Sequence, residues 1–185
     1  MEAMKPVKRS VAVVVRRTAC VPDGEGAASA GAFLVVQRPD DPADPLRGAW
    51  GLPAVTLHDG EDDRDAVVRA GRVKLGVELA PGRRIGEKTA DRGGYLLRLT
   101  DYEATIVSGV PGVPQPDASM TQYSACRFTA DPGVLDEAAA RGSVCAQVFL
   151  EDSVLPGDSV LPGDCVLPGD CVLPGDSVPN RLDPA

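Results

Sequence analysis

One amphipathic segment, residues 62–75, constrains the fold of this chain more than any other feature of the sequence. Three aspartates lie in its first turn and Lys74 lies in its last, which suits the dipole of a helix. Gly76 follows where a C-terminal glycine cap is expected, whereas Gly71 inside the segment costs up to about 1 kcal/mol relative to alanine. Apolar residues recur at helical spacing, which predicts one buried face: Ala66, Val67, Ala70, Val73 and Val77.

Short runs rich in β-branched and aliphatic residues surround this helix and predict strands. Loops rich in proline and glycine separate them, as in the stretch PDDPADPLRG. A helical stretch at 131–142, extended by 143–150, follows the last strand. The mixture predicts an α/β protein of the α+β sandwich type, with a mixed sheet flanked by helices. The predicted strands are 11–17, 32–38, 51–57, 84–89, 95–100, 102–107 and 122–129.

The chain divides into three predicted parts: a flexible N-terminus at 1–9, a folded domain at 10–150 and a low-complexity tail at 151–185. The tail repeats a six-residue unit of the form DSVLPG or DCVLPG. Four such units are too few for a hexapeptide β-helix, and each Pro-Gly pair favours a type II turn. We therefore expect a turn-rich or disordered tail, either dispensable or used for self-association.

Composition limits the classes of function. A formal net charge of −8 disfavours nucleic-acid binding, because a phosphate backbone usually meets a basic face. No apolar run reaches the about 20 residues that cross a bilayer, and the run at 11–15 is too short for a signal peptide, so we expect a cytoplasmic protein without a membrane partner. One histidine and five cysteines without a CxxC pair supply few zinc ligands, which favours buried or free surface thiols.

The strand AFLVVQR, a loop, the stretch GAWGLPAVTLHDGED and a helix ending in KLGVEL occur in this order. This order resembles the Nudix family, whose signature is G-x5-E-x7-R-E-U-x-E-E-x-G-U, with U an aliphatic residue, after a WGLPGG strand end. The residues that match the signature are Gly60, Glu61, Arg69 and Gly76, with Ala66 and Val77 at further usual positions. The resemblance implies the Nudix fold over about residues 10–150.

The resemblance also implies metal-dependent cleavage of a nucleoside diphosphate linked to another group. In the family, three helix glutamates bind Mg²⁺ or Mn²⁺, because carboxylates at such spacing converge on one helix face. This chain has Ala70, Val73 and Lys74 at those positions. No metal site is therefore predicted, and Mg²⁺ or Mn²⁺ binding would depend on displaced acids, for which Glu61 and Asp63 are the weak catalytic candidates.

Four residues are candidates for contacts with a substrate: Arg38, Arg47, Trp50 and Lys74. Lys74 can hold a phosphate as a point charge, or it can be a solvated lysine at the helix end. Arg38 and Arg47 flank the proline-rich loop. They either contact the phosphates of a ligand or are solvated loop residues. Trp50 either stacks on a base or packs in the core.

Three further positions enter the interpretation. His58, before Gly60, is interpreted as a solvated histidine rather than a catalytic base, and Glu103 as an exposed strand residue rather than a cleft acid. Ala54 and Val55 replace the paired glycines of the family, so a loop with positive φ at these positions would be strained.

The sequence thus favours a Nudix-like protein that binds a nucleotide or another phosphate-containing small molecule with weak or no hydrolysis. Two alternatives remain open: an active Nudix hydrolase that uses displaced acids, and a non-catalytic structural or interaction protein. Whether the chain is an enzyme, which ligand it binds and its oligomeric state are not decided by these residues.

Overall fold

A computed structural model describes residues 4–17, 31–114 and 122–154. Within these residues seven strands form one mixed sheet in the order β3-β2-β1-β6-β5, with β4 paired to β1 and β7 paired to β2. The β1 and β6 strands run parallel, and the other pairs are antiparallel. The bounds are β1 Val7–Arg16, β2 Phe33–Gln37, β3 Trp50–Gly51, β4 Ala54–Thr56, β5 Glu78–Asp91, β6 Leu96–Ser108 and β7 Ala125–Thr129.

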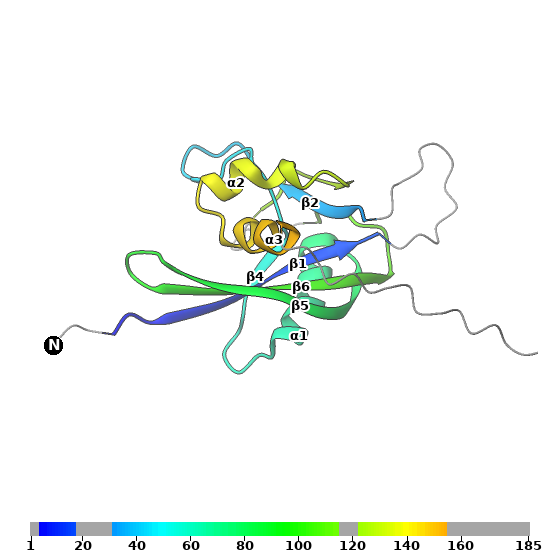
Figure 1. Cartoon of the computed structure of the whole chain (residues 1–185). Helices are drawn as coiled ribbons and strands as arrows, with labels where there is room; N and C mark the ends of the chain where they lie inside the picture. The colour runs from blue at the N-terminus through cyan, green and yellow to red at the C-terminus, as the bar shows by residue number, and fades with distance from the viewer. Residues whose placement is uncertain (1–3, 18–30, 115–121, 155–185) are drawn as a thin grey trace, which may run out of the picture. The chain divides into compact units, whose positions relative to one another are not determined.

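Helices cover both faces of this sheet. The α1 helix (Asp63–Ala70) continues into a π-helical turn, η1 (Gly71–Leu75), on one side. The α2 (Asp136–Ala140) and α3 (Val144–Val154) helices, which follow the 3₁₀ turn η2 (Pro132–Leu135), lie on the other side (Figure 1). The predicted sandwich of a mixed sheet and flanking helices is confirmed.

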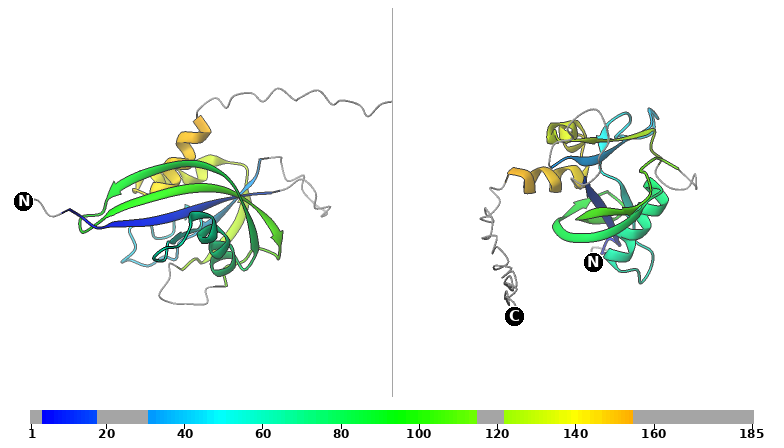
Figure 2. Two further views of the ribbon diagram at one scale, coloured as in Figure 1. Left: turned by 90° about the horizontal axis from the view of Figure 1, so that it is seen from below. Right: turned by 90° about the vertical axis from the view of Figure 1, so that its right-hand side faces the viewer.

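The central strand β1 shows why its sequence is a continuous apolar run. Val11, Val13 and Val15 face the core that contains the α1 residues, whereas Ala12 and Val14 face the core that contains the α2 and α3 residues. A strand covered on both faces needs apolar side chains at every position rather than at every second one. β1 pairs with β6 along its whole length, and β5 lies on the other side of β6 (Figure 2).

The predicted helix at 62–75 is confirmed in its position and in its C-terminal glycine cap, and the structure adds an N-terminal cap at Asp62. The Asp62 side chain accepts a hydrogen bond from the Arg64 amide, and Gly76 ends the helix with a φ of 69°. Gly71, which the sequence marks only as a cost, is required by packing. A Cβ at this position would lie 2.6 Å from Cγ of Leu79, so η1 approaches β5 too closely for a side chain.

Some predicted boundaries differ from the structure. The two strands predicted at 95–100 and 102–107 form one strand, β6, which passes through Asp101. β1 begins at Val7, inside the segment predicted to be flexible, and α3 continues to Val154, inside the predicted tail. The rest of that tail, with its repeats, lies outside the described residues.

Two local expectations can also be compared with the structure. Ala54 and Val55 lie in the extended strand β4, where Val55 pairs with Val11, so this segment forms a strand where the family has its paired glycines. Cys126 and Cys145 are free thiols, half-buried and buried respectively. No helix in the described part of the chain is long and apolar enough to span a membrane.

Candidate functional site

A pocket of about 690 Å³ opens where β2, β3 and β4 meet the end of η1 and the start of α3. This volume lies in the range that holds a drug-sized ligand. The described residues that line it include five lysine or arginine residues and one residue with a carboxylate, Asp44. The five cationic residues are Arg38, Arg69, Lys74, Arg92 and Arg141. The pocket lining is therefore basic although the chain as a whole is acidic, but two of its cations are paired with carboxylates, Arg38 with Asp44 and Arg69 with Glu61.

Lys74 is the most unusual of these cations, because only 4% of its surface is exposed. Its Nζ lies 5.4 Å from the centre of the Tyr123 ring, a distance at which an ammonium group is attracted to an aromatic face. Burial, followed by the charges of Arg38 and Arg69, lowers the pKa of Lys74 to about 8. The interpretation of Lys74 as a solvated lysine at the helix end is therefore wrong.

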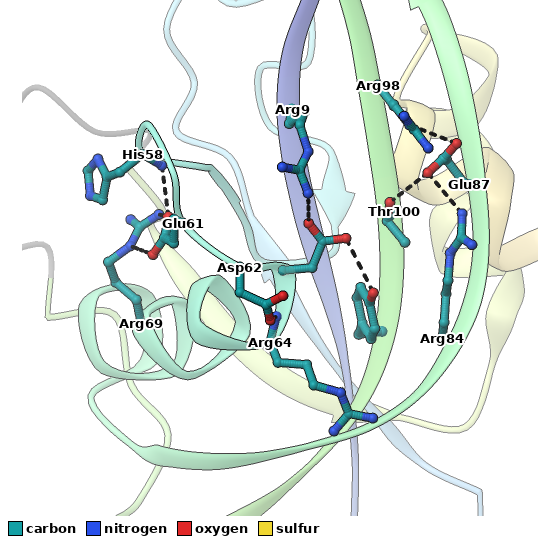
Figure 3. Close-up of polar contacts among 12 residues, drawn as sticks. Arg9, His58, Glu61, Asp62, Arg64, Arg69, Arg84, Glu87, Arg98 and Thr100 are labelled. Atoms are coloured by element: carbon teal, nitrogen blue, oxygen red, sulfur yellow. Dashed lines mark hydrogen bonds and ion pairs between the residues drawn. The ribbon is translucent and has the colours of Figure 1, made fainter.

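Glu61 is held by Arg69 in a two-pronged ion pair (Figure 3). Arg69 donates from Nε to Oε1 and from Nη2 to Oε2, each at 2.7 Å, and the His58 amide donates to Oε2 at 2.8 Å. The hydrogen bonds from Arg69 are the main cause that lowers the pKa of Glu61 to about 2. Arg69 also donates to the Thr56 carbonyl at 2.8 Å, so the pair ties the loop to α1 and β4.

Asp63, the second displaced acid, is also engaged with basic and polar neighbours. Its carboxylate accepts a hydrogen bond from Arg9 and another, at 3.3 Å, from the Tyr102 hydroxyl. Neither Asp63 nor Glu61 is among the residues that line the pocket. Each candidate acid is therefore engaged by an arginine, and the partner of Glu61, Arg69, itself lines the pocket.

The residues present do not fit the metal cluster that the family signature implies. Ala70 is fully buried in the core under α1, Val73 packs at its edge, and Lys74 brings a cation to the pocket. Among the described residues, no group of three histidine, cysteine, aspartate or glutamate side chains is placed to hold an ion. A hard divalent cation needs several oxygen ligands, which this helix face does not supply.

The other predicted substrate contacts divide between the pocket and the outside. Arg38 and Trp50 line the pocket; Arg38 pairs with Asp44 at 3.2 Å, and the Arg127 guanidinium lies 4.5 Å from the centre of the Trp50 ring. Arg47 is half-exposed, does not line the pocket, and lies 4.0 Å from Asp40.

His58 lines the pocket mouth as an exposed side chain. Glu103 does not line the pocket; it is half-buried, and its carboxylate accepts hydrogen bonds from Arg16 and Arg83. Sequence reasoning missed Tyr123, which lines the pocket and accepts a hydrogen bond from the Ala54 amide at 3.2 Å. Burial raises the pKa of Tyr123 to about 12, so its hydroxyl stays protonated. Its position at the start of a predicted strand gave no signal of this role.

Comparisons with known proteins identify the fold. No family model and no curated protein matches the sequence. The structure is similar to the E. coli ORF135 protein, with 18% identity, a TM-score of 0.60, and coverage of 83% of this chain and 96% of that chain. It is also similar to a MutT protein from Methanosarcina mazei Go1, with 16% identity, a TM-score of 0.56 and the same coverage.

A third similar structure is a MutT NUDIX hydrolase from Burkholderia pseudomallei, with 22% identity and a TM-score of 0.52 over 71% of this chain and 86% of that chain. At identities this low, the similarity concerns the arrangement of the chain and not the chemistry of the site. The predicted resemblance is confirmed at this level: the chain has the fold of the Nudix and MutT hydrolases.

Proposed function

We propose that this chain is a Nudix-fold protein that binds a nucleotide or another phosphate-containing small molecule in the basic pocket, with weak or no hydrolysis. The observation that carries the proposal is the placement of Lys74. A signature glutamate would bring a negative charge to this position, and the chain places a buried ammonium group there instead.

The charge of the pocket supports an anionic ligand. Arg38 and Arg69 lower the pKa of Lys74, although Arg38 pairs with Asp44 and Arg69 pairs with Glu61, so three cations lie near one another with two carboxylates beside them. An anion that enters would relieve this repulsion and gain charge-assisted hydrogen bonds. In the family, a bound metal ion provides the positive charge for the diphosphate; here the side chains provide it themselves.

The same arrangement argues against efficient hydrolysis. A metal ion in such sites activates the attacking water as well as binding the phosphate. Lysine supplies charge but does not activate water in this way. Glu61 and Asp63, the acids that an active hydrolase could use in place of the missing glutamates, are engaged by Arg69 and Arg9.

A thermal-shift experiment tests the proposal. We expect ATP, ADP and pyrophosphate to raise the melting temperature in the presence of EDTA, because a ligand that binds only the folded state stabilises it. We expect Lys74→Met to weaken binding at pH 7 by at least about tenfold, as loss of a charged hydrogen-bond partner costs about 1.5–3 kcal/mol. Lys88→Met is the matched control, because Lys88 pairs with Glu151 away from the pocket lining.

Activity assays separate the alternatives. Release of phosphate or nucleoside monophosphate at ordinary enzyme rates with Mg²⁺ or Mn²⁺ would contradict binding with weak hydrolysis and favour the displaced-acid hydrolase. No stabilisation by any phosphate compound, with or without metal, would instead favour a structural or interaction protein.

A further inference from the structure

One carboxyl group in the core has no use in the proposed binding of phosphate. Asp101, on β6, is completely buried, and neither of its carboxyl oxygens has a hydrogen-bond partner among the described residues. Buried polar groups in folded proteins are nearly always hydrogen-bonded, so an exception needs an explanation. Asp101 pairs with Ala12 of β1, which faces the core under α2 and α3, so the carboxyl lies on the α3 side of the sheet.

The α3 helix covers this carboxyl closely. A Cβ on Gly86, the β5 residue that pairs with Asp101, would lie 2.9 Å from Cγ1 of Val148, so the helix rests directly on the strand beside the acid. Asp101 interacts electrostatically with Cys145 and Asp152, both on α3. The carboxyl therefore has strands beside it and a helix above it, and it meets water only when one of these elements moves.

The charged groups on the packed elements do not compensate an ionised Asp101. On this side of the sheet the described cations are engaged elsewhere, and the described acids have the same sign as the carboxylate. Burial, followed by the charge of Asp152, raises the pKa of Asp101 well above its ordinary value. The pairs on this side are Arg16 with Glu103, Arg83 with Glu103 and Asp152, and Lys88 with Glu151, while Lys8 lies over the Tyr95 ring and the Cys145 thiol lies beside the Ser143 hydroxyl.

We propose that α3 is a movable wall of the pocket, which stays closed on the sheet while the unpartnered Asp101 beneath it holds a proton and opens when that proton leaves. The strands beside Asp101 are joined to one another by backbone hydrogen bonds. The α3 helix is held by side-chain packing, such as the contact of Phe149 with Phe33, and by ion pairs at its rim. The helix is therefore the element that moves at the lowest cost.

The position of α3 connects this motion to the pocket. Ser143, Val144 and Cys145, at the start of the helix, line the pocket. Gly142, which precedes them, has a φ of 91°, a conformation that favours glycine and allows the chain to turn between α2 and α3. Opening of α3 about this residue would remove one side of the pocket and expose the thiol of Cys145.

The direction of the pH effect follows from proton linkage. The closed helix favours the protonated acid, whereas in the opened state the carboxyl meets water and has an ordinary pKa. The closed state is therefore fully favoured below about pH 4 and loses this advantage as the pH rises toward the raised pKa. Each pH unit in that interval should increase the population of the opened helix by up to about tenfold, since one proton is released for each opening.

Hydrogen exchange of backbone amides on the folded full chain, followed by NMR from about pH 5 to 8 and corrected for intrinsic exchange rates, tests the proposal. We expect the amides at 148–153 of α3 to exchange faster than those at 11–15 of β1 at every pH, because opening of α3 leaves the pairing of β1 intact. We also expect the opened population of α3 to rise with pH by up to about tenfold per unit.

Alkylation by iodoacetamide gives a second measurement. The rate at Cys145, mapped by mass spectrometry and divided by its rate in the urea-unfolded chain at the same pH, should rise with pH as the α3 amides do. The half-buried Cys126 on β7 should show no such rise.

Two variants identify the group responsible. Asp101→Asn should remove the pH dependence at α3, and Asp101→Leu should do the same with an apolar side chain. Asp91→Asn is the matched control, because this exposed carboxylate at the end of β5 pairs with Lys5 and should leave the pH dependence unchanged.

Exchange at α3 as slow as at β1 would overturn the proposal, because the helix would then open only together with the whole fold. Exchange at α3 that is independent of pH after correction would also overturn it. Both results come from the wild type, so they do not depend on the folding of a variant. Neither measurement uses a ligand, so a failure here leaves the proposed phosphate binding intact.

Discussion

The Glu61–Arg69 pair should be the most important polar interaction that holds the loop before α1, and Glu61→Gln tests its strength. The carboxylate and guanidinium are 12% and 23% exposed, so solvent screens the pair only weakly. A pKa lowered from 4.5 to about 2 corresponds to about 3 kcal/mol of preference for the charged form in the folded state. We expect Glu61→Gln to lower the free energy of unfolding at pH 7 by up to this amount, because a neutral amide loses the charge and presents donors to donors.

Urea denaturation, followed by the fluorescence of Trp50, the single tryptophan, measures this loss. A group with a lowered folded-state pKa stabilises the fold above its unfolded-state pKa and loses this contribution as the pH falls. The difference between wild type and variant should therefore be full at pH 7 and shrink as the pH falls from about 4.5 to 2. Glu78→Gln removes an exposed pair with Arg72 and should have a much smaller effect.

Two results would refute this reasoning. A loss at pH 7 below about 0.5 kcal/mol would place the pair among ordinary surface ion pairs. Stabilisation of the wild type by Mg²⁺ that disappears in Glu61→Gln would show that the carboxylate is free to hold a metal ion, as the displaced-acid hydrolase requires.

Three further outcomes are expected. Gly71→Ala should destabilise the fold by about 1–3 kcal/mol in the same urea assay, because its Cβ would lie 2.6 Å from Cγ of Leu79, whereas Gly94→Ala meets no atom within 4 Å. Burial raises the pKa of Asp101 well above its ordinary value, so wild-type stability should fall as the pH rises from about 4, and Asp101→Asn should flatten that profile. As the pH rises through about 8, wild-type Lys74 loses its charge, whereas the arginine of Lys74→Arg keeps it. Titration calorimetry should therefore show that the wild type loses about tenfold in pyrophosphate affinity relative to the variant.

Much of the fold follows from local patterns in the sequence. The helix at 62–75 has its apolar face and glycine cap in the sequence, and the β-branched run that forms β1 is visible without any tertiary information. The continuity of β6 was not predictable in this way. Asp101 divides the run into two predicted strands, although in the structure this carboxyl is fully buried and neither of its oxygens has a hydrogen-bond partner among the described residues.

The site was less predictable, because its contacts join distant parts of the chain. The i, i+4 spacing of Asp65 and Arg69 favours an ion pair along the helix, but Arg69 reaches back to Glu61, eight residues earlier. The turn at Gly60, with a φ of 77°, returns the loop to α1 and brings Glu61 within reach. Helix periodicity describes neighbours along one helix and contains no information about such a loop.

Lys74 shows the same limitation with greater consequence for function. Its place in the last helical turn is typical of a solvated lysine that favours the helix dipole. In the structure the segment after β6 returns to this turn, where the Gly112 amide donates to the Leu75 carbonyl at 2.9 Å, and Tyr123 from the segment before β7 covers the lysine. The burial of Lys74 therefore arises from residues about 40 to 50 positions later in the chain.

The three replaced signature positions have different physical consequences, which bears on how the pocket works. Ala70 is fully buried among core residues and Val73 packs against the same core, so these two positions contribute apolar contacts that a carboxylate could not make without a large desolvation cost. Lys74 alone keeps a charge, and the charge has the opposite sign. A pocket whose glutamates bind a cation attracts phosphate through that ion, whereas the binding proposed for this pocket uses the charge of the lysine directly. Its affinity should therefore follow the protonation of one lysine and not the concentration of a metal.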